Sequence, residues 1–367
     1  MQSEKPIAHI AFSISTRPQR PAEENPIYRG AQLAIAELKD DPSLPMRLAW
    51  KVFDDFGNIE TTRKFAQEIV ADPGIIGVVG PMGSHEALAS APIFNEAGLV
   101  QISPCASHPD LCRRRYKTFF RLVANEEAQG GELARMAYGY LKARRAAVIH
   151  ADDAWATTTS EIFMREYEKL GGKVIERQPY PNQSDDFSPL IQATVAADPE
   201  LVFCAVHPRE GVMISAGLRH VGLKIPFLGT DAMKTAFPLG GGESNAEAYH
   251  TYSGADFRRL PSAAAFRQAY VARFPEDSTY SPEAYDALMI IAAALRRAGQ
   301  PDRQQILKEV RQLRDFQGVS GLINFDPTGE RVGAPISFYH VVKADTGRRM
   351  EYLGTTLELL PMAETTR

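Results

Sequence analysis

The chain has little cysteine: only Cys105, Cys112 and Cys204 occur in 367 residues. Their spacing fits no paired-cysteine zinc pattern, and the eight histidines form no H-E-x-x-H motif, so the sequence predicts no metal site. Cys105 and Cys112 are near enough in sequence to close a small disulfide ring in an oxidising compartment, and two free thiols are the alternative. The pattern leaves the state of this pair open.

An excess of basic charge is also missing, because 41 Lys and Arg stand against 45 Asp and Glu, giving a formal charge of −4. The one basic run, Arg113–Arg115, has no interleaved aromatic residues and indicates a solvated surface. This balance argues against a nucleic-acid-binding protein.

Long apolar runs are absent too. The longest, "ALMIIAAAL" at 287–295, is about half the length of a membrane-spanning helix. The N-terminal residues "MQSEKPIAHIAF" show no signal-peptide pattern. The chain is therefore either cytosolic or a secreted protein from which an export signal has been removed.

Catalytic signatures are lacking. The chain contains neither G-x-x-x-x-G-K-[ST] nor G-x-S-x-G. Asp54–Asp55 and Asp152–Asp153 are adjacent carboxylate pairs, but neighbours on a strand point to opposite faces, so we expect one of each pair to cap a helix or face solvent. The sequence predicts that the protein is not an enzyme and uses no cofactor.

What the chain does contain is a regular alternation of strand-like and helix-like segments. Strand patterns occupy residues 7–14, 47–55, 75–81 and 99–104, with helical patterns between them at 25–41, 59–72 and 85–98. A second series follows, with strands at 145–152, 173–181, 201–208 and 225–231 and helices at 126–143, 157–172, 186–198 and 209–222. A Gly-rich stretch at 239–245, helices at 262–274 and 281–299 and a β-rich tail complete the chain. This order predicts an α/β protein with two doubly wound, Rossmann-like lobes.

In doubly wound sheets, ligands bind beyond the carboxyl ends of the strands. The segments at these ends are "GPMGSH", "SPCASHP", "HADDAWA", "AVHPRE" and "GTDAM". They are rich in hydroxyls and turn residues, and they include Trp155, His207 and Asp231. A polar small-molecule site is the resulting hypothesis.

The chain resembles the leucine/isoleucine/valine-type substrate-binding proteins of ABC transporters, which are type I periplasmic binding proteins. The resemblance extends from about residue 6 to 345 and is carried by the order of several motifs: "GAQLAI", "VVGPMGS", "AGLVQISPCASHPDL", "YKTFFRL", "DDFSPLI" and "LINFDPTGE". It implies a Venus-flytrap architecture in which a multi-strand hinge joins the lobes and the ligand cleft lies between them. Lobe one would comprise residues 5–123 and 255–331, and lobe two residues 124–254 and 332–360.

The resemblance also implies roles for particular residues. Ser84 and Ser107 would bind the α-carboxylate of an amino acid, with backbone amides near Ala106. The backbone carbonyl of Cys105 would accept from the α-ammonium, and Asp231, where many relatives have Glu, would pair with it.

Two further positions depart from the family pattern. Trp155 stands where relatives usually carry Tyr, and its ring would still close over the ligand and attract an ammonium. His207 stands where relatives often place an aromatic residue. These departures bear on which side chain is bound more than on the class of ligand.

The residues themselves also permit ordinary structural roles. Ser84 is a candidate helix N-cap, Ser107 a turn residue, and Asp231 a capping acid. Trp155 fits a core aromatic and His207 a local hydrogen-bonding residue. Residues 15–26 would border the ligand side chain, or their charges are merely solvated.

Together these observations predict an extracytoplasmic solute-binding protein of an ABC importer, located in the periplasm or at the cell surface. It would bind a small α-amino acid, branched-chain or otherwise apolar or aromatic, by closure of its lobes, and membrane permease subunits would be its partners. A cytosolic ligand sensor of the same fold, responsive to amides or amino acids, and an enzyme on the same scaffold remain the rival interpretations.

Overall fold

A computed structural model describes residues 5–16, 21–181, 184–234, 247–274, 279–343 and 348–359. The chain forms two compact units, one of residues 1–124 and 254–334 and the other of residues 125–253 and 335–367. The predicted Gly-rich stretch at 239–245 lies outside the described residues.

The first unit is built around a five-stranded parallel sheet in the order β2-β1-β3-β4-β5. Its strands and helices are β1 Ile7–Ile14, α1 Pro26–Leu38, β2 Arg47–Asp54, α2 Ile59–Ala71, β3 Ile75–Val79, α3 Ser84–Glu96, β4 Gln101–Ser103, α4 Asp110–Arg113, β5 Phe119–Arg121, α10 Ala264–Val271, α11 Ser281–Ala298, α12 Arg303–Arg311, β11 Phe316–Gly318 and β12 Gly321–Ile323.

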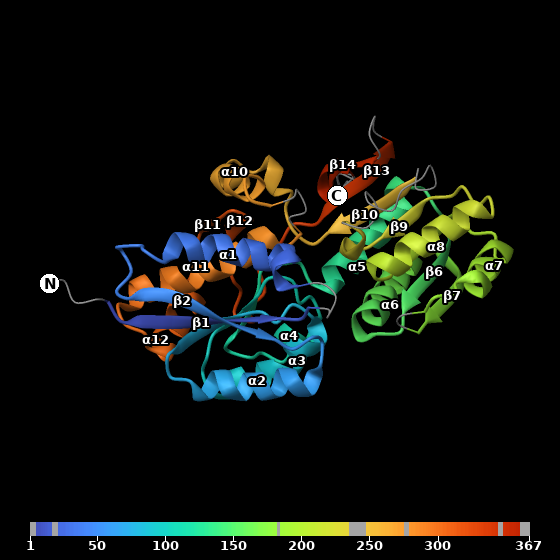
Figure 1. Ribbon diagram of the computed structural model, residues 1–367. Helices are drawn as coiled ribbons and strands as arrows, with labels where there is room; N and C mark the ends of the chain where they lie inside the picture. Colours follow the sequence, from blue (N-terminus) through green and yellow to red (C-terminus); the bar gives the residue numbers. More distant parts are fainter. Residues whose placement is uncertain are drawn as a thin grey trace, which may run out of the picture. The chain divides into compact units, whose positions relative to one another are not determined.

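Alternation along β1 explains how this sheet is covered on both faces. Ile10, Phe12 and Ile14 belong to one core with α1, α11 and α12, whereas Ala11 belongs to a second core with α2 and α3. Figure 1 shows α1 and α11 on one side of β1 and β2 and α2 on the other.

The second unit contains a seven-stranded sheet in the order β14-β13-β10-β9-β8-β6-β7, in which β6 to β10 are parallel and β13 and β14 antiparallel. Its elements are α5 Glu126–Arg135, β6 Arg145–Ala151, α6 Ala154–Lys169, β7 Lys173–Tyr180, α7 Ser188–Ala196, β8 Leu201–Ala205, α8 Pro208–His220, β9 Phe227–Gly229, the 3₁₀-helix η3 Asp231–Met233, β10 Ala248–Tyr252, β13 Ser337–Lys343, β14 Arg348–Thr355 and α13 Thr356–Leu359.

Two α/β sheets made mostly of parallel strands confirm the predicted fold class. The strand expected at residues 7–14 has those bounds. The helix expected over 126–143 is confirmed as far as Tyr140, as an α-helix to Arg135 and a π-helix from Met136 to Tyr140, and it is wrong only for residues 141–143. The sequence patterns did not predict α4, β5, β10 or α12.

Side-chain caps fix where several helices begin. Asn25, Asn58 and Asn125 accept from a backbone N–H two or three residues ahead, at the starts of α1, α2 and α5. Asp153 does the same at α6, so this helix begins at Ala154 rather than at residue 157 as expected. The helix thus starts directly after β6 and carries Trp155 in its first turn.

Helix α5 lies close to α6 at a glycine. A Cβ added to Gly130 would lie 2.6 Å from Ile162 Cγ2 and 3.2 Å from Phe163 N, whereas one on the neighbouring Gly131 would find its nearest atom, Glu166 Cγ, at 4.0 Å. Only the first position therefore requires glycine.

We expect Gly130→Ala to lower the free energy of unfolding by about 1–3 kcal/mol, because the methyl group overfills the α5–α6 contact. Gly131→Ala is the matched control, and it should raise the same free energy by about 0.5–1 kcal/mol through helix propensity. Urea denaturation measures both, and a Gly130→Ala protein as stable as the wild type would contradict the argument.

Candidate functional site

Each sheet brings a set of loops to the carboxyl ends of its parallel strands. In the first unit, Ser84 follows β3 and residues 104–109 follow β4. In the second unit, Trp155 follows β6, His207 follows β8, and Asp231 follows β9. The strand order reverses between β6 and β8, the position at which doubly wound sheets bind ligands.

The loops after β3 and β4 contact each other through backbone and hydroxyl groups. Gly80 has φ of +105°, and a Cβ there would lie 2.2 Å from Ser13 O, so the first loop needs glycine at its start. Ser103 Oγ donates to Pro81 O at 2.9 Å and accepts from Ala106 N at 3.0 Å. One buried hydroxyl therefore joins the two loops.

Ser84 is a second link between them. Its Oγ accepts from the backbone N–H groups of Ser107 and His108, at 3.2 and 3.1 Å. A hydroxyl that accepts twice still has its own proton to donate. The expectation that Ser84 caps a helix is wrong, because Gly83 occupies the N-cap position and Ser84 is the first residue of α3.

Cys105 and Ala106 lie in the same loop. Cys105 is partly buried, and its Sγ donates to Met82 O at 3.1 Å. Cys112, which is buried, and Cys105 are both free thiols, which answers the question that the sequence left open. Burial raises the pKa of the Cys112 thiol to about 12, so it stays protonated.

In the second unit, Trp155 and His207 lie together. Their ring centroids are 5.5 Å apart at an interplanar angle of 39°. His207 Nε2 lies 2.7 Å from Asp153 Oδ2, while Asp153 Oδ1 accepts from Ala156 N at 2.9 Å. His207 thus makes a structural hydrogen bond, the role considered from the sequence, although its partner is 54 residues away. This bond fixes its ring beside Trp155.

Asp231 begins the short helix η3. Ser253 Oγ donates to Asp231 Oδ2 at 3.1 Å and accepts from Gln129 Nε2 at 2.5 Å. Burial raises the pKa of the Asp231 carboxyl, against the opposing effect of hydrogen bonds from Gln129 and Ser253. The carboxylate is therefore incompletely stabilised by its own surroundings.

The expectation that one acid of each adjacent pair caps a helix or faces solvent holds for Asp152–Asp153 but not for Asp54–Asp55, where Asp54 is partly buried and accepts from Thr16 N at 3.0 Å. Asp153 caps α6 and Asp152 is exposed. Asp55 is buried and accepts from Ser15 Oγ, Gly57 N and Thr62 Oγ1, so it organises the loop after β2.

Several residues of this site were assigned no role from the sequence. Gln129 and Ser253 act through a contact between distant segments, whereas Ser103 bonds both to Ala106 in its own loop and to Pro81 in the preceding loop. Arg121, in the motif "YKTFFRL", donates to Ala106 O in the loop after β4. Glu330, in the motif "LINFDPTGE", accepts from Arg121. Of the segment 15–26, residues 17–20 lie outside the described residues.

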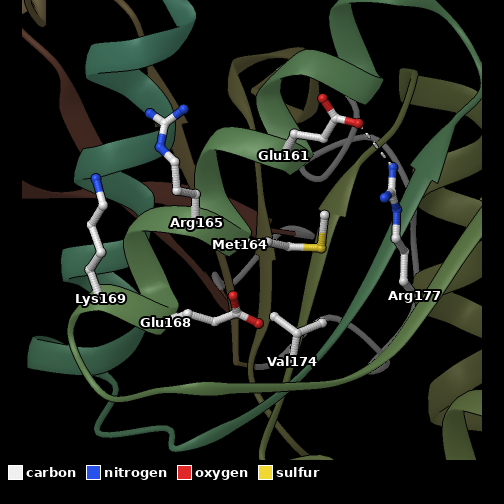
Figure 2. Close-up of a pocket in the computed structure, with 7 residues that line it drawn as sticks. All are labelled: Glu161, Met164, Arg165, Glu168, Lys169, Val174 and Arg177. Carbon is white, nitrogen blue, oxygen red and sulfur yellow. Dashed lines mark hydrogen bonds and ion pairs between the residues drawn. The ribbon is translucent and has the colours of Figure 1, made fainter.

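A cavity of about 680 Å³ lies elsewhere in the second unit, between α6 and β7. Figure 2 shows its charged lining, with Glu161 and Arg177 joined at 3.4 Å. None of the residues expected to bind a ligand lines it; the lining residues are Glu161, Met164, Arg165, Glu168, Lys169, Val174 and Arg177.

Across the residues that the structure describes, no three His, Cys, Asp or Glu side chains are grouped so that they could hold a metal ion. No helix there combines the length and apolar character needed to cross a membrane.

Comparison with known proteins gives consistent matches over nearly the whole chain. The family model described as "Periplasmic binding protein" matches residues 22–347. Leu/Ile/Val-binding protein homolog 3 of Brucella melitensis is 24% identical over 324 residues, which cover 88% of this chain and 87% of that protein.

Solved structures agree in fold. A leucine binding protein, LivK, from Thermotoga maritima matches with a TM-score of 0.85 and 24% identity, over 95% of this chain and 98% of that chain. The branched-chain amino acid transporter substrate binding protein LivJ from Streptococcus pneumoniae, in complex with isoleucine, matches with a TM-score of 0.82 and 20% identity, over 95% of this chain and 100% of that chain.

Ser84→Ala tests the link between the loops. Removing the acceptor leaves the amides of Ser107 and His108 unsatisfied, so we expect their hydrogen exchange to accelerate by about tenfold or more and the free energy of unfolding to fall by about 1–3 kcal/mol. NMR-detected exchange measures the first effect. Ser90→Ala is the control, because Ser90 Oγ donates to carbonyls of its own helix, and unchanged exchange in Ser84→Ala would contradict the assignment.

Proposed function

The chain belongs to the periplasmic binding protein family, whose model spans residues 22–347, and from this premise we propose that it is a non-catalytic solute-binding protein for a small α-amino acid. The ligand is branched-chain or otherwise apolar or aromatic. Ser84 and Ser107 would recognise the carboxylate of the zwitterion, and Asp231 and the backbone carbonyl of Cys105 its ammonium. The names of its relatives, Leu/Ile/Val-binding protein homolog 3 and the leucine binding protein LivK, support this ligand class.

The carboxylate end of the ligand is received by the first unit. Ser84 and Ser107 supply hydroxyl donors, and the N-terminus of α3, which begins at Ser84, contributes backbone N–H groups and a favourable dipole. A carboxylate removed from water requires several such donors. The carbonyl of Cys105 accepts from the ligand ammonium.

The ammonium end is held mainly by Asp231, and this residue carries the proposal. Its raised pKa shows that burial disfavours the charged form in the free protein. A bound ammonium adds a positive charge at short range, which stabilises both partners. An acid with this property at the carboxyl end of a parallel strand is typical of a binding site.

The second unit also shapes the part of the site that meets the ligand side chain. Trp155 offers an aromatic face, and the ring of His207 is held beside it by Asp153. An apolar or aromatic side chain gains contact area on these rings. The pair thus serves as the determinant of ligand choice within the amino-acid class.

The setting of this function follows from the family. Periplasmic binding proteins of importers work outside the cytoplasm and deliver ligand to membrane subunits. We assign the protein to the periplasm or cell surface, with an ABC permease as its partner and a preference of the permease for the ligand-bound form. A cytosolic sensor of the same fold is less well supported, because LivJ is named for a transporter.

Asp231→Ala should weaken binding of the preferred amino acid by about 2 kcal/mol or more, because the ammonium loses its counter-charge. Calorimetric titration with the twenty amino acids first identifies that ligand in the wild type. Asp152→Ala, which removes an exposed acid of the same unit, is the control and should leave affinity unchanged. Equal affinity of Asp231→Ala and wild type would refute the assigned role.

Binding should also depend on pH in a defined direction. Because the pKa of Asp231 is raised, protons compete with the ligand ammonium at a higher pH than the value of about 4 at which an ordinary carboxyl protonates. Affinity is then full above the raised pKa and falls as the pH is lowered through it, with proton release on binding in that range. Calorimetry in buffers of different ionisation enthalpy detects the released protons, and their absence would contradict the role.

A further inference from the structure

A buried arginine lies beneath the loop that follows β4. Arg121, the last residue of β5, has no exposed side-chain surface. Its Nη1 donates to the backbone carbonyls of Ala106 and His108, at 3.3 and 2.9 Å. Its Nε and Nη2 donate to the two carboxylate oxygens of Glu330, at 2.7 and 2.5 Å.

Glu330 is itself held in place by a turn. Asp326 Oδ1 accepts from Thr328 N at 2.7 Å and from Glu330 N at 3.1 Å. The backbone of Arg121 donates to Gly329 O at 3.0 Å, so the turn lies against β5. The guanidinium therefore has a fixed partner on one side and the loop on the other.

These contacts hold one peptide plane from both edges. In the peptide between Ala106 and Ser107, the carbonyl accepts from Arg121 and the N–H donates to Ser84 Oγ. Because the two groups of a trans peptide point in opposite directions, these bonds together fix the rotation of the plane. The loop cannot turn away from Arg121 without leaving a buried, charged donor unsatisfied.

We propose that Arg121 and Glu330 form a positioning pair that orients the ligand-binding loop 104–109 without touching the ligand. That the loop binds ligand rests on the proposed function. That Arg121 and Glu330 orient the loop is a property of the free protein and can be tested without ligand. The pair fixes the loop to the rigid sheet. The hydroxyl of Ser107 and the carbonyl of Cys105 are therefore already in place before the ligand binds.

The chain offers a control for general loss of stability. Arg303 also donates to backbone carbonyls in the first unit, those of Ile75 and Val70, each at 2.9 Å. These carbonyls belong to β3 and α2, not to the loop. Substitution of Arg303 thus removes a comparable set of bonds without releasing residues 104–109.

Cys105 provides a readout that needs no ligand. It is the partly exposed thiol of the loop, whereas Cys112 and Cys204 are buried and burial raises the pKa of both. The rate at which a thiol reagent modifies Cys105, followed by peptide mass spectrometry, reports how well the loop is ordered.

The experiment compares Arg121→Gln, Arg121→Lys, Glu330→Gln and Arg303→Gln in the full chain, with the free energy of unfolding measured for each. For Arg121→Gln we expect modification of Cys105 to accelerate by about tenfold or more and ligand affinity to fall by about tenfold or more. Arg121→Lys, which keeps the charge but lacks the planar fork, and Glu330→Gln should change both in the same direction by about threefold or more. Arg303→Gln should change the modification rate of Cys105 and the ligand affinity by no more than about twofold each, even if it lowers the free energy of unfolding as much as Arg121→Gln does.

The outcomes separate this inference from the proposed function. Faster modification of Cys105 in the Arg121 and Glu330 variants supports the positioning role even if the wild type binds none of the twenty amino acids, a result that would overturn the proposed function alone. Wild-type modification rates and affinity in Arg121→Lys and Glu330→Gln would overturn the positioning role, and they would do so even if Arg121→Gln failed to fold. Equal effects in Arg303→Gln would also overturn it, because the change would then follow stability alone.

Discussion

Parallel pairing of strands is the constraint on which the rest of the molecule depends. It places the carboxyl ends of β3 and β4 at one edge of the first sheet and those of β6, β8 and β9 at one edge of the second. Helices must cover both faces of such sheets, which leaves the strand ends as the place where polar loops can form. All the residues assigned to the ligand follow directly from one of these ends.

The loops at these edges have no regular hydrogen-bonding ladder of their own, so side chains complete their backbone bonds. Ser103 and Ser84 join the loops after β3 and β4, and Arg121 holds two carbonyls of the second loop. In the second unit, Asp153 both caps α6 and holds His207. These hydrogen bonds between buried polar groups of the loops also shape the site.

The sequence predicted the elements whose signals are local and missed those that depend on distant partners. The alternation from Ile7 to Ile14 was enough to place β1, and turn residues marked the loops around Ser84, Ser107 and Asp231. The bond between Arg121 and Glu330 joins residues 209 apart, and that between His207 and Asp153 joins residues 54 apart. Neither has a local pattern, although the resemblance contained both motifs of the first pair. The roles of the site residues toward a ligand stay predictions.

The central claim is that both charged ends of a zwitterion are recognised, and three related ligands test it directly. Calorimetry would compare the amino acid that binds most tightly among leucine, isoleucine, valine and phenylalanine with its 2-oxo acid, which lacks the ammonium, and with its amine, which lacks the carboxylate. The account predicts that the amino acid binds and that each analogue binds about 100-fold more weakly or worse, since each leaves buried partners without their charge. An analogue that binds as tightly as the amino acid would contradict it.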